Sequence, residues 1–152
     1  MRYARILLPL AALALAAARV AREADAFALL ANRHRAEVGC AALRWDARLA
    51  AAAQAHADDM RARAYFDHTS PEGRSFAQRL RDAGLVERGP AGENLALGQP
   101  DAAHALADWL RSPPHRENLD DCGFTHHGLG VSGPYWVHVL ARLPAAPAAA
   151  AH

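Results

Sequence analysis

The sequence predicts a single α+β domain, and three observations support this prediction. Up to Pro113 and Pro114, apolar side chains recur mainly at helical spacing between turns. Residues 124–143 instead carry two β-like runs. The chain has 152 residues, a length that suits one domain with one hydrophobic core. Helices gathered early and strands gathered late predict a layered core built from both.

Two helices come first in this prediction. Residues 25–38 carry apolar side chains at helical spacing, and Gly39 is typical of the residue that follows a helix. Asp46 is a favourable N-cap for a second helix that extends to about Ala64. The inward face of this second helix is rich in alanine, so we expect another element to pack closely against it.

Two shorter helices and one strand are expected in the middle of the chain. Ser75 and Gln78 have the spacing of a capping box, which begins a short helix after a loop over residues 65–73. Residues 93–97 are expected to form a short buried strand. The last helix is expected to follow the N-cap Asp101 and to end at the proline pair, because proline lacks the amide hydrogen and has a fixed φ.

The last part of the chain predicts a β-hairpin. Residues 124–132 and 135–143 are β-like, and Gly133 and Pro134 between them are typical of a turn. Both faces of the second run are largely apolar, so we expect a central strand that is covered on both sides.

The N-terminal residues have the pattern of an export segment. Arg2 and Arg5 precede an apolar run over residues 6–18, and Ala16 and Ala18 offer a cleavage pattern of small residues. A membrane-spanning helix needs about 20 apolar residues. The run is shorter than that, so cleavage is the favoured interpretation and an uncleaved membrane anchor is the alternative.

Three parts of the chain follow from these patterns. Residues 1–24 are interpreted as a signal peptide or N-terminal anchor with a short linker, residues 25–143 as the domain, and residues 144–152 as a disordered tail of alanine and proline. Such a chain is secreted or periplasmic, or membrane-anchored if the first segment is kept.

The formal net charge of the chain is +1, with acids and bases interspersed, which argues against nucleic acid as a partner. A monomer is assumed.

The two cysteines, Cys40 and Cys122, form an even pair. In an oxidising compartment such a pair commonly forms a disulfide. A bridge that closes so long a loop would stabilise the fold by about 3–5 kcal/mol in the chain-entropy model. Two unpaired buried thiols are the alternative that the sequence leaves open.

Three polar residues stand in predicted loops or at element ends, where functional side chains concentrate: His68, Glu93 and His115. Two imidazoles and a carboxylate suit either a zinc site or a hydrogen-bonded acid–base pair. Their separations of 25 and 22 residues match no local metal motif. The spacing alone therefore favours three unrelated roles.

A succession of short motifs runs through residues 25–143. The motifs are Leu43-Arg44-Trp45-Asp46, Ala55-His56-Ala57, Phe66-Asp67-His68-Thr69-Ser70-Pro71, Arg79, Gly92-Glu93-Asn94-Leu95-Ala96, Ser112-Pro113-Pro114-His115-Arg116-Glu117-Asn118 after Trp109, Gly128-Leu129-Gly130-Val131 and Tyr135-Trp136. In order and spacing this succession resembles the bacterial branch of the CAP superfamily. That SCP-like family is named for cysteine-rich secretory proteins, antigen 5 and pathogenesis-related proteins.

The resemblance implies a three-layer α-β-α sandwich with a central antiparallel sheet and a polar cleft lined by two histidines and two acids. His68 and Glu93 match the first histidine and the first acid, and His115 is the counterpart of the second histidine. Ser112 stands where the second acid is expected, and Glu117 is the nearest substitute. A complete set of four ligands is therefore not implied.

Two functions follow from the resemblance. The favoured one is an exported module that binds a small apolar ligand, a divalent metal such as zinc, or a cell-envelope partner, and that requires no cofactor. The alternative is a zinc-dependent hydrolase or peptidase in which His68 and His115 hold zinc and Glu93 activates water. The sequence contains neither an H-E-x-x-H motif nor a G-x-S-x-G elbow, which favours binding over catalysis.

The other large aromatic and polar side chains are expected to have structural roles. We expect Trp45, Trp109 and Trp136 in the core, His56 as a hydrogen-bonded core histidine, Arg35 paired with a buried carboxylate, Asn94 and Asn118 bonded to loop backbone, and His126 and His127 on a strand surface.

Overall fold

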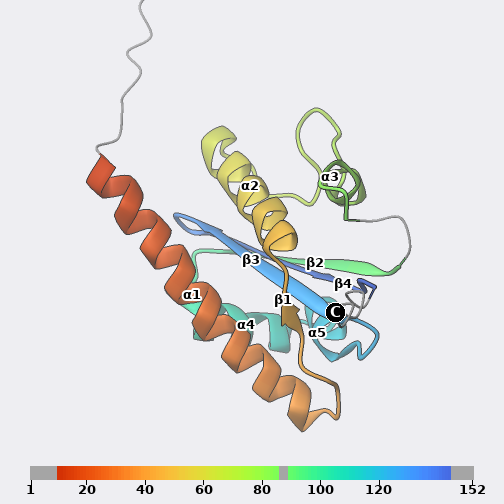
Figure 1. The fold of residues 1–152 in the computed structure, drawn as a ribbon. Coiled ribbons are helices and arrows are strands. Elements are labelled where there is room, and N and C mark those ends of the chain that lie inside the picture. The colour runs from red at the N-terminus through yellow and green to blue at the C-terminus, as the bar shows by residue number, and fades with distance from the viewer. Residues whose placement is uncertain (1–9, 86–88, 145–152) are drawn as a thin grey trace, which may run out of the picture.

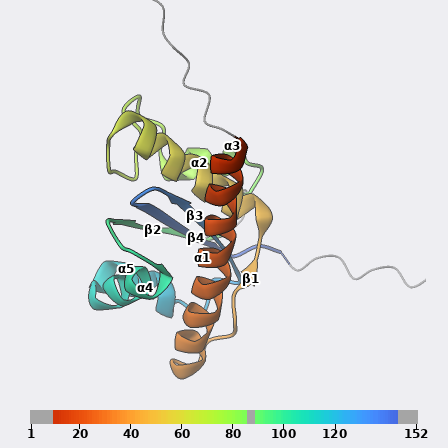
Figure 2. The same ribbon diagram turned by 90° about the vertical axis from the view of Figure 1, so that its left-hand side faces the viewer.

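The computed structural model describes residues 10–85 and 89–144. Its elements are, in chain order, α1 (Leu10–Glu37), β1 (Arg44–Trp45), α2 (Ala47–Arg63), α3 (Phe76–Asp82), β2 (Ala91–Leu97), α4 (Ala102–Arg111), α5 (Pro113–Asp120), β3 (His126–Ser132) and β4 (Tyr135–Ala141). Helices α2 and α3 cover one side of the sheet, and α4 and α5 cover the other side together with α1 (Figures 1 and 2). The three-layer α-β-α sandwich is confirmed.

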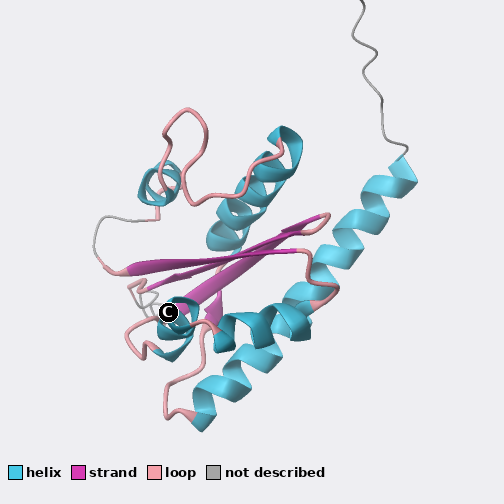
Figure 3. Ribbon diagram, turned by 180° about the vertical axis from the view of Figure 1, so that it is seen from behind, coloured by secondary structure: helices cyan, strands magenta, loops and turns pink. Residues whose placement is uncertain are grey.

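The sheet has the strand order β1-β3-β4-β2. The pairs β3–β4 and β4–β2 are antiparallel, as expected, whereas the two residues of β1 pair in parallel with β3. The sequence did not predict β1, because two residues are too few to show a periodicity. Seen from behind, the strands run between the two helical layers (Figure 3).

Strand β4 is central and buried on both faces, which confirms the prediction for the second β-like run. Trp136 packs in the core on the side of α1 and α4, with Phe27 and Trp109. Val137 and Val139 pack in the core on the side of α2 and α3. The alternation of side chains along the strand thus separates two hydrophobic cores.

Two glycines of β3 allow α2 to lie directly on the backbone of the sheet. A methyl group on Gly128 would stand 2.2 Å from the backbone nitrogen of Ala50, and one on Gly130 would stand 2.3 Å from that of Gln54. The Gln54 side chain also exchanges two hydrogen bonds with the backbone of Val131. This contact explains why the inward face of α2 is built from alanine.

Helix α1 is longer than predicted, because it begins at Leu10 rather than near residue 25. Its first turns are exposed, with Leu10 86% accessible, whereas packing against the core begins at Val20. Across the described residues, none of the helices combines the length and the apolar character that a membrane crossing requires. Residues 1–9 of the predicted export segment and residues 145–152 of the predicted tail lie outside the described ranges.

A second correction concerns the proline pair. Helix α4 ends there as predicted, but Pro113 also begins α5, so the motif around His115 is a helical turn and not a loop. Proline is well tolerated at the first position of a helix, because the amide of that position has no partner within the helix. The sequence predicts only that the two prolines end α4, and it does not predict that they begin another helix.

The disulfide forms between Cys40, after α1, and Cys122, after α5. Beside it Arg35 is fully buried, but it does not pair with a carboxylate as predicted. Its guanidinium donates hydrogen bonds to the backbone carbonyls of Ala41, Leu119, Asp121 and Phe124. These carbonyls lie where the chain leaves a helix or changes direction, and the five donors of arginine suit several such acceptors.

A buried histidine pair occupies the core beneath α1. His127 and His138 are fully buried, with 3.2 Å between Nδ1 of His127 and Nε2 of His138, so the prediction of a surface position for His127 was wrong. Trp45, predicted in the core, is instead 44% exposed and contacts the ring of His127 edge to face. Burial lowers the pKa of His127 to about 4, with smaller contributions from Arg35 and His126, and burial also lowers the pKa of His138.

The close contact of α2 with β3 generates a stability prediction. Gly130→Ala should lower the free energy of unfolding by about 3 kcal/mol, because the added methyl group collides with helix backbone that cannot move away cheaply. Gly98→Ala is the control, since Gly98 has a positive φ of 97° but open space around it. The control should cost only about 1 kcal/mol, from backbone strain alone. Equal losses in urea unfolding would contradict the close packing.

The histidine pair generates a pH prediction. Because the folded pKa of His127 lies below the unfolded value of about 6.5, the unfolded chain binds protons first and stability falls as the pH drops from about 6.5 towards 4. His127 alone accounts for a loss on the order of 3 kcal/mol over that window. The variant His127→Leu/His138→Leu should show a flatter profile when urea unfolding is measured across this range. A profile parallel to that of the wild type would refute this account.

Candidate functional site

The candidate site lies where the loop between α2 and α3 meets strand β2. Ala64 ends α2 in the left-handed conformation, which turns the chain into the loop. Within the loop, the Asp67 side chain accepts a hydrogen bond from the backbone of Thr69. The loop thereby brings His68 over Glu93 of β2, although the two residues are 25 positions apart in the sequence.

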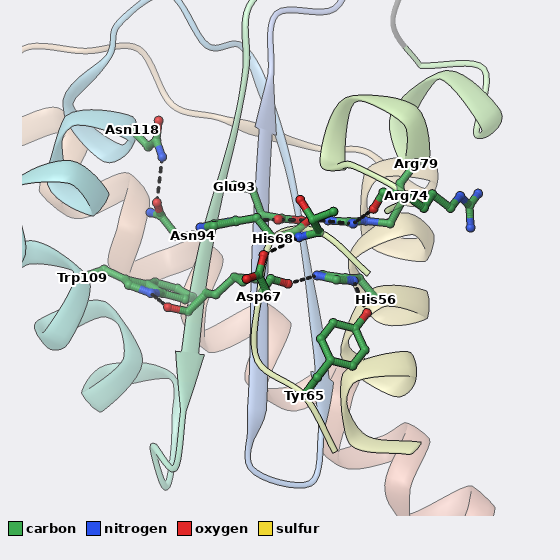
Figure 4. Close-up of polar contacts among 12 residues, drawn as sticks. His56, Tyr65, Asp67, His68, Arg74, Arg79, Glu93, Asn94, Trp109 and Asn118 are labelled. Atoms are coloured by element: carbon green, nitrogen blue, oxygen red, sulfur yellow. Dashed lines mark hydrogen bonds and ion pairs between the residues drawn. The ribbon is translucent and has the colours of Figure 1, made fainter. Parts of the chain in front are cut away.

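Glu93 is a buried carboxylate with two partners. Its side chain is only 2% exposed. Nη2 of Arg79 donates to both of its oxygens, at 3.0 and 2.8 Å, and Nδ1 of His68 lies 2.8 Å from Oε1 (Figure 4). A buried charge is costly unless it is paired and hydrogen-bonded, and here it is both.

Arg79 was part of the motif succession but was not predicted as a site residue. Besides Glu93, its Nη1 donates to the backbone carbonyl of His68 at 2.8 Å and reaches that of Arg74 at 3.4 Å. No spacing rule connects an arginine on a short helix with a glutamate on a later strand. Its place among the motifs was the only indication that the sequence offered.

His68 is the solvent-exposed member of the group formed with Arg79 and Glu93. Its side chain is 53% exposed. The hydrogen bond to Glu93 raises the pKa of His68 above its ordinary value, against the opposing effect of burial, and the charges of Glu93 and Asp67 raise it further. Because Nδ1 is engaged with Glu93, Nε2 is the ring atom left to meet a ligand.

His115 lies near this pair but does not join it. On the first turn of α5, its Nδ1 is 2.9 Å from Oγ of Ser112. Burial lowers the pKa of His115, and the positive charge of His68 lowers it further, so the two rings share one electrostatic environment. Asn94 ties α5 to β2 by donating to the backbone carbonyl of His115, so it bonds to backbone as expected, but to that of a helix and not of a loop. Asn118 donates to the side chain of Asn94 and not to backbone.

The predicted zinc set is not assembled by these contacts. Glu117 is exposed on α5, and Ser112 contacts only His115 among the candidate residues. Within the described ranges, no group of three or more histidine, cysteine, aspartate or glutamate side chains is placed to hold a metal ion. The donor set therefore does not fit a zinc centre with three protein ligands.

Two pockets are lined in part by Arg79. The first, of about 210 Å³, is polar and lies beside His56, whose Nε2 is 2.9 Å from the backbone oxygen of Asp67. His56 is the hydrogen-bonded core histidine that the sequence predicted. The second pocket, of about 380 Å³, is bounded by alanines of α2 and α3 and by charged side chains. Its lining residues are Arg48, Ala51, Ala52, Ala55, Arg74, Arg79, Asp82 and Ala83.

Comparison with solved structures identifies the fold as that of an SCP domain. An extracellular SCP-domain protein from Bacillus anthracis str. Ames matches with a TM-score of 0.75 and 33% identity, over 80% of this chain and 40% of that protein. An outer surface protein of Borrelia burgdorferi shares the fold at a TM-score of 0.70 and 19% identity, over 79% of this chain and 92% of that protein.

The chain belongs to the CAP family, the cysteine-rich secretory protein family, whose model matches residues 30–135. This confirms the resemblance found in the sequence. Among curated proteins of Bacillus subtilis (strain 168), the membrane protein YlbC is 38% identical over 107 residues and YkwD is 36% identical over 109 residues. Each match covers 70% of this chain, which spans only 31% of YlbC and 42% of YkwD.

Proposed function

We propose that this chain is an exported binding module that captures a small, largely apolar ligand beside the Arg79–Glu93–His68 group. One observation carries the choice of binding over hydrolysis. Both oxygens of Glu93 are engaged by Arg79, one of them also by His68, and the carboxylate is buried. A general base must be able to reach a water molecule and take its proton. Glu93 is buried and already hydrogen-bonded at both oxygens, which leaves a water molecule little access to it.

The alanine-lined pocket supports the chemical class of the ligand. Its volume of about 380 Å³ lies within the range of small-molecule sites, and small side chains let a ligand approach the backbone of α2. Arg74 and Arg48 also line it, each in an ion pair with an aspartate, so the pocket offers a charged side for a polar end of the ligand. Arg79 lines this pocket and also bonds Glu93, so one side chain connects the pocket with the His68–Glu93 pair, although neither of those two residues lines it.

Export is supported by the position at which α1 begins to pack. Arg19 reaches the backbone oxygen of Gly133, and Val20 is the first residue that packs against the core. Cleavage after Ala18 would therefore leave the hydrophobic core intact. The Bacillus anthracis relative is described as extracellular and YlbC as a membrane protein, so a cell-envelope setting with an envelope partner fits this chain as well.

The ligand prediction is tested with a bacterial lipid extract. After incubation and repurification, the chain should retain an apolar molecule that mass spectrometry detects. Ala55→Phe fills both pockets and should reduce retention at least about tenfold, which corresponds to about 1.4 kcal/mol. Ala62→Phe adds the same side chain to an exposed position of the same helix and should retain as much as the wild type. Equal retention by both variants would place the ligand elsewhere.

The metal alternative is tested by calorimetric titration with zinc. Because the described part of the chain holds no group of three possible metal ligands, we expect no binding of micromolar or tighter affinity at neutral pH. Tight binding that disappears in both His68→Ala and His115→Ala would contradict this expectation. It would establish one convergent metal site and reopen the hydrolase alternative.

A further inference from the structure

Arg79 makes hydrogen bonds to both of the other residues of the cleft group, Glu93 and His68. Its Nη2 holds both oxygens of Glu93, and its Nη1 holds the backbone carbonyl of His68. One guanidinium therefore bonds both to the Glu93 carboxylate, which accepts from the His68 ring, and to the backbone of His68 itself (Figure 4). The side chain of Arg79 is itself 9% exposed and lies over the ring of Phe76, which restricts its rotamer.

We infer that Arg79 is the positioning residue of the cleft: by fixing Glu93 and the backbone of His68, it commits Nδ1 of His68 to Glu93 and leaves Nε2 as the ring atom available to a ligand. The inference rests on the proposed function, because it names the residue that prepares the binding atom of that same site.

The contacts around Glu93 explain why Arg79 is needed for this arrangement. Within the described residues, Arg79 and His68 are the partners of the Glu93 carboxylate. Without Arg79, the carboxylate would be buried against one imidazole, and it would be free to rotate towards solvent. Lysine could supply a charge, but it cannot reproduce a planar fork that bonds two oxygens and a carbonyl together.

The consequence for His68 is a fixed position of one ring hydrogen. Because a carboxylate only accepts hydrogen bonds, Nδ1 of His68 carries a hydrogen whether the ring is neutral or charged. Only Nε2 then changes with protonation, and it makes no hydrogen bond among the contacts of the described ranges. A ligand therefore meets the same atom of His68 in both states.

Nitrogen-15 spectra of the imidazoles in the full chain test this inference, because they report which ring nitrogen carries the hydrogen. The measurement is made in alkaline buffer, where the ring is neutral, and His68→Gln assigns the signal among nine histidines. The wild type should show the Nδ1–H form of His68. In Arg79→Gln this form should lose its dominance, and Arg79→Lys should restore it only in part. Arg81→Gln, an exposed position on the same helix, should match the wild type.

A variant that leaves Glu93 unpaired can fail to fold, so a charge-neutral variant accompanies it. Arg79→Gln/Glu93→Gln removes both charges of the pair, and it should fold and show a mixture of the two ring forms. A dominant Nε2–H form in the wild type would overturn the inference. So would an unchanged Nδ1–H form in a folded Arg79→Gln protein, because Glu93 would then position His68 by itself.

These outcomes are separate from the test of the proposed function. If the wild type retains a ligand and Arg79→Gln leaves the ring form unchanged, the positioning role is wrong and the binding function stands. If the ring form changes as expected and no ligand is retained, the positioning role stands and the binding function is wrong.

Discussion

The structure depends on the direct contact between helix α2 and the backbone of strand β3. Gly128 and Gly130 leave no side chain between the two elements, and Gln54 bonds to the strand backbone in both directions. Interiors pack as densely as organic crystals, so a helix seated in this way has little freedom to shift. The end of α2 determines where the following loop and α3 lie. His68 comes from that loop and Arg79 from that helix, so the contact with β3 determines where both stand relative to β2.

The other constraint is a charge placed in an edge strand. Glu93 lies in a strand whose neighbours are buried, and desolvation of its carboxylate is offset by Arg79, whose Nη2 bonds both oxygens, and by the histidine. The pairing that makes the fold tolerate this charge also engages both oxygens of the carboxylate. What is left facing solvent is an imidazole with one free nitrogen. Our proposal of ligand recognition rather than hydrolysis is built on this arrangement.

Elements with local determinants were predicted well. Asp46, Ser75 and Asp101 each cap a helix with the side-chain hydrogen bonds that the sequence suggested. The hairpin and the central position of β4 followed from alternation and a turn motif. The errors arose at residues whose burial or hydrogen-bond partners are determined by an element that is distant in the sequence. His127 alternates towards a face that α1 covers, and Arg35 bonds to carbonyls that come together only after two helices have packed.

The sequence by itself determined the family and most of the helices and strands, because motif order and local capping are written along the chain. That His68 and Glu93 share one cleft was implied only by the resemblance to the family, since their spacing matches no local motif. Tertiary structure alone decided that His115 bonds to Ser112, that Glu117 is exposed on α5, and that Arg79 joins the Glu93–His68 pair. The physical reason is the range of the interactions. Periodicity and caps act over a few residues, whereas burial of a charge depends on every element that packs around it.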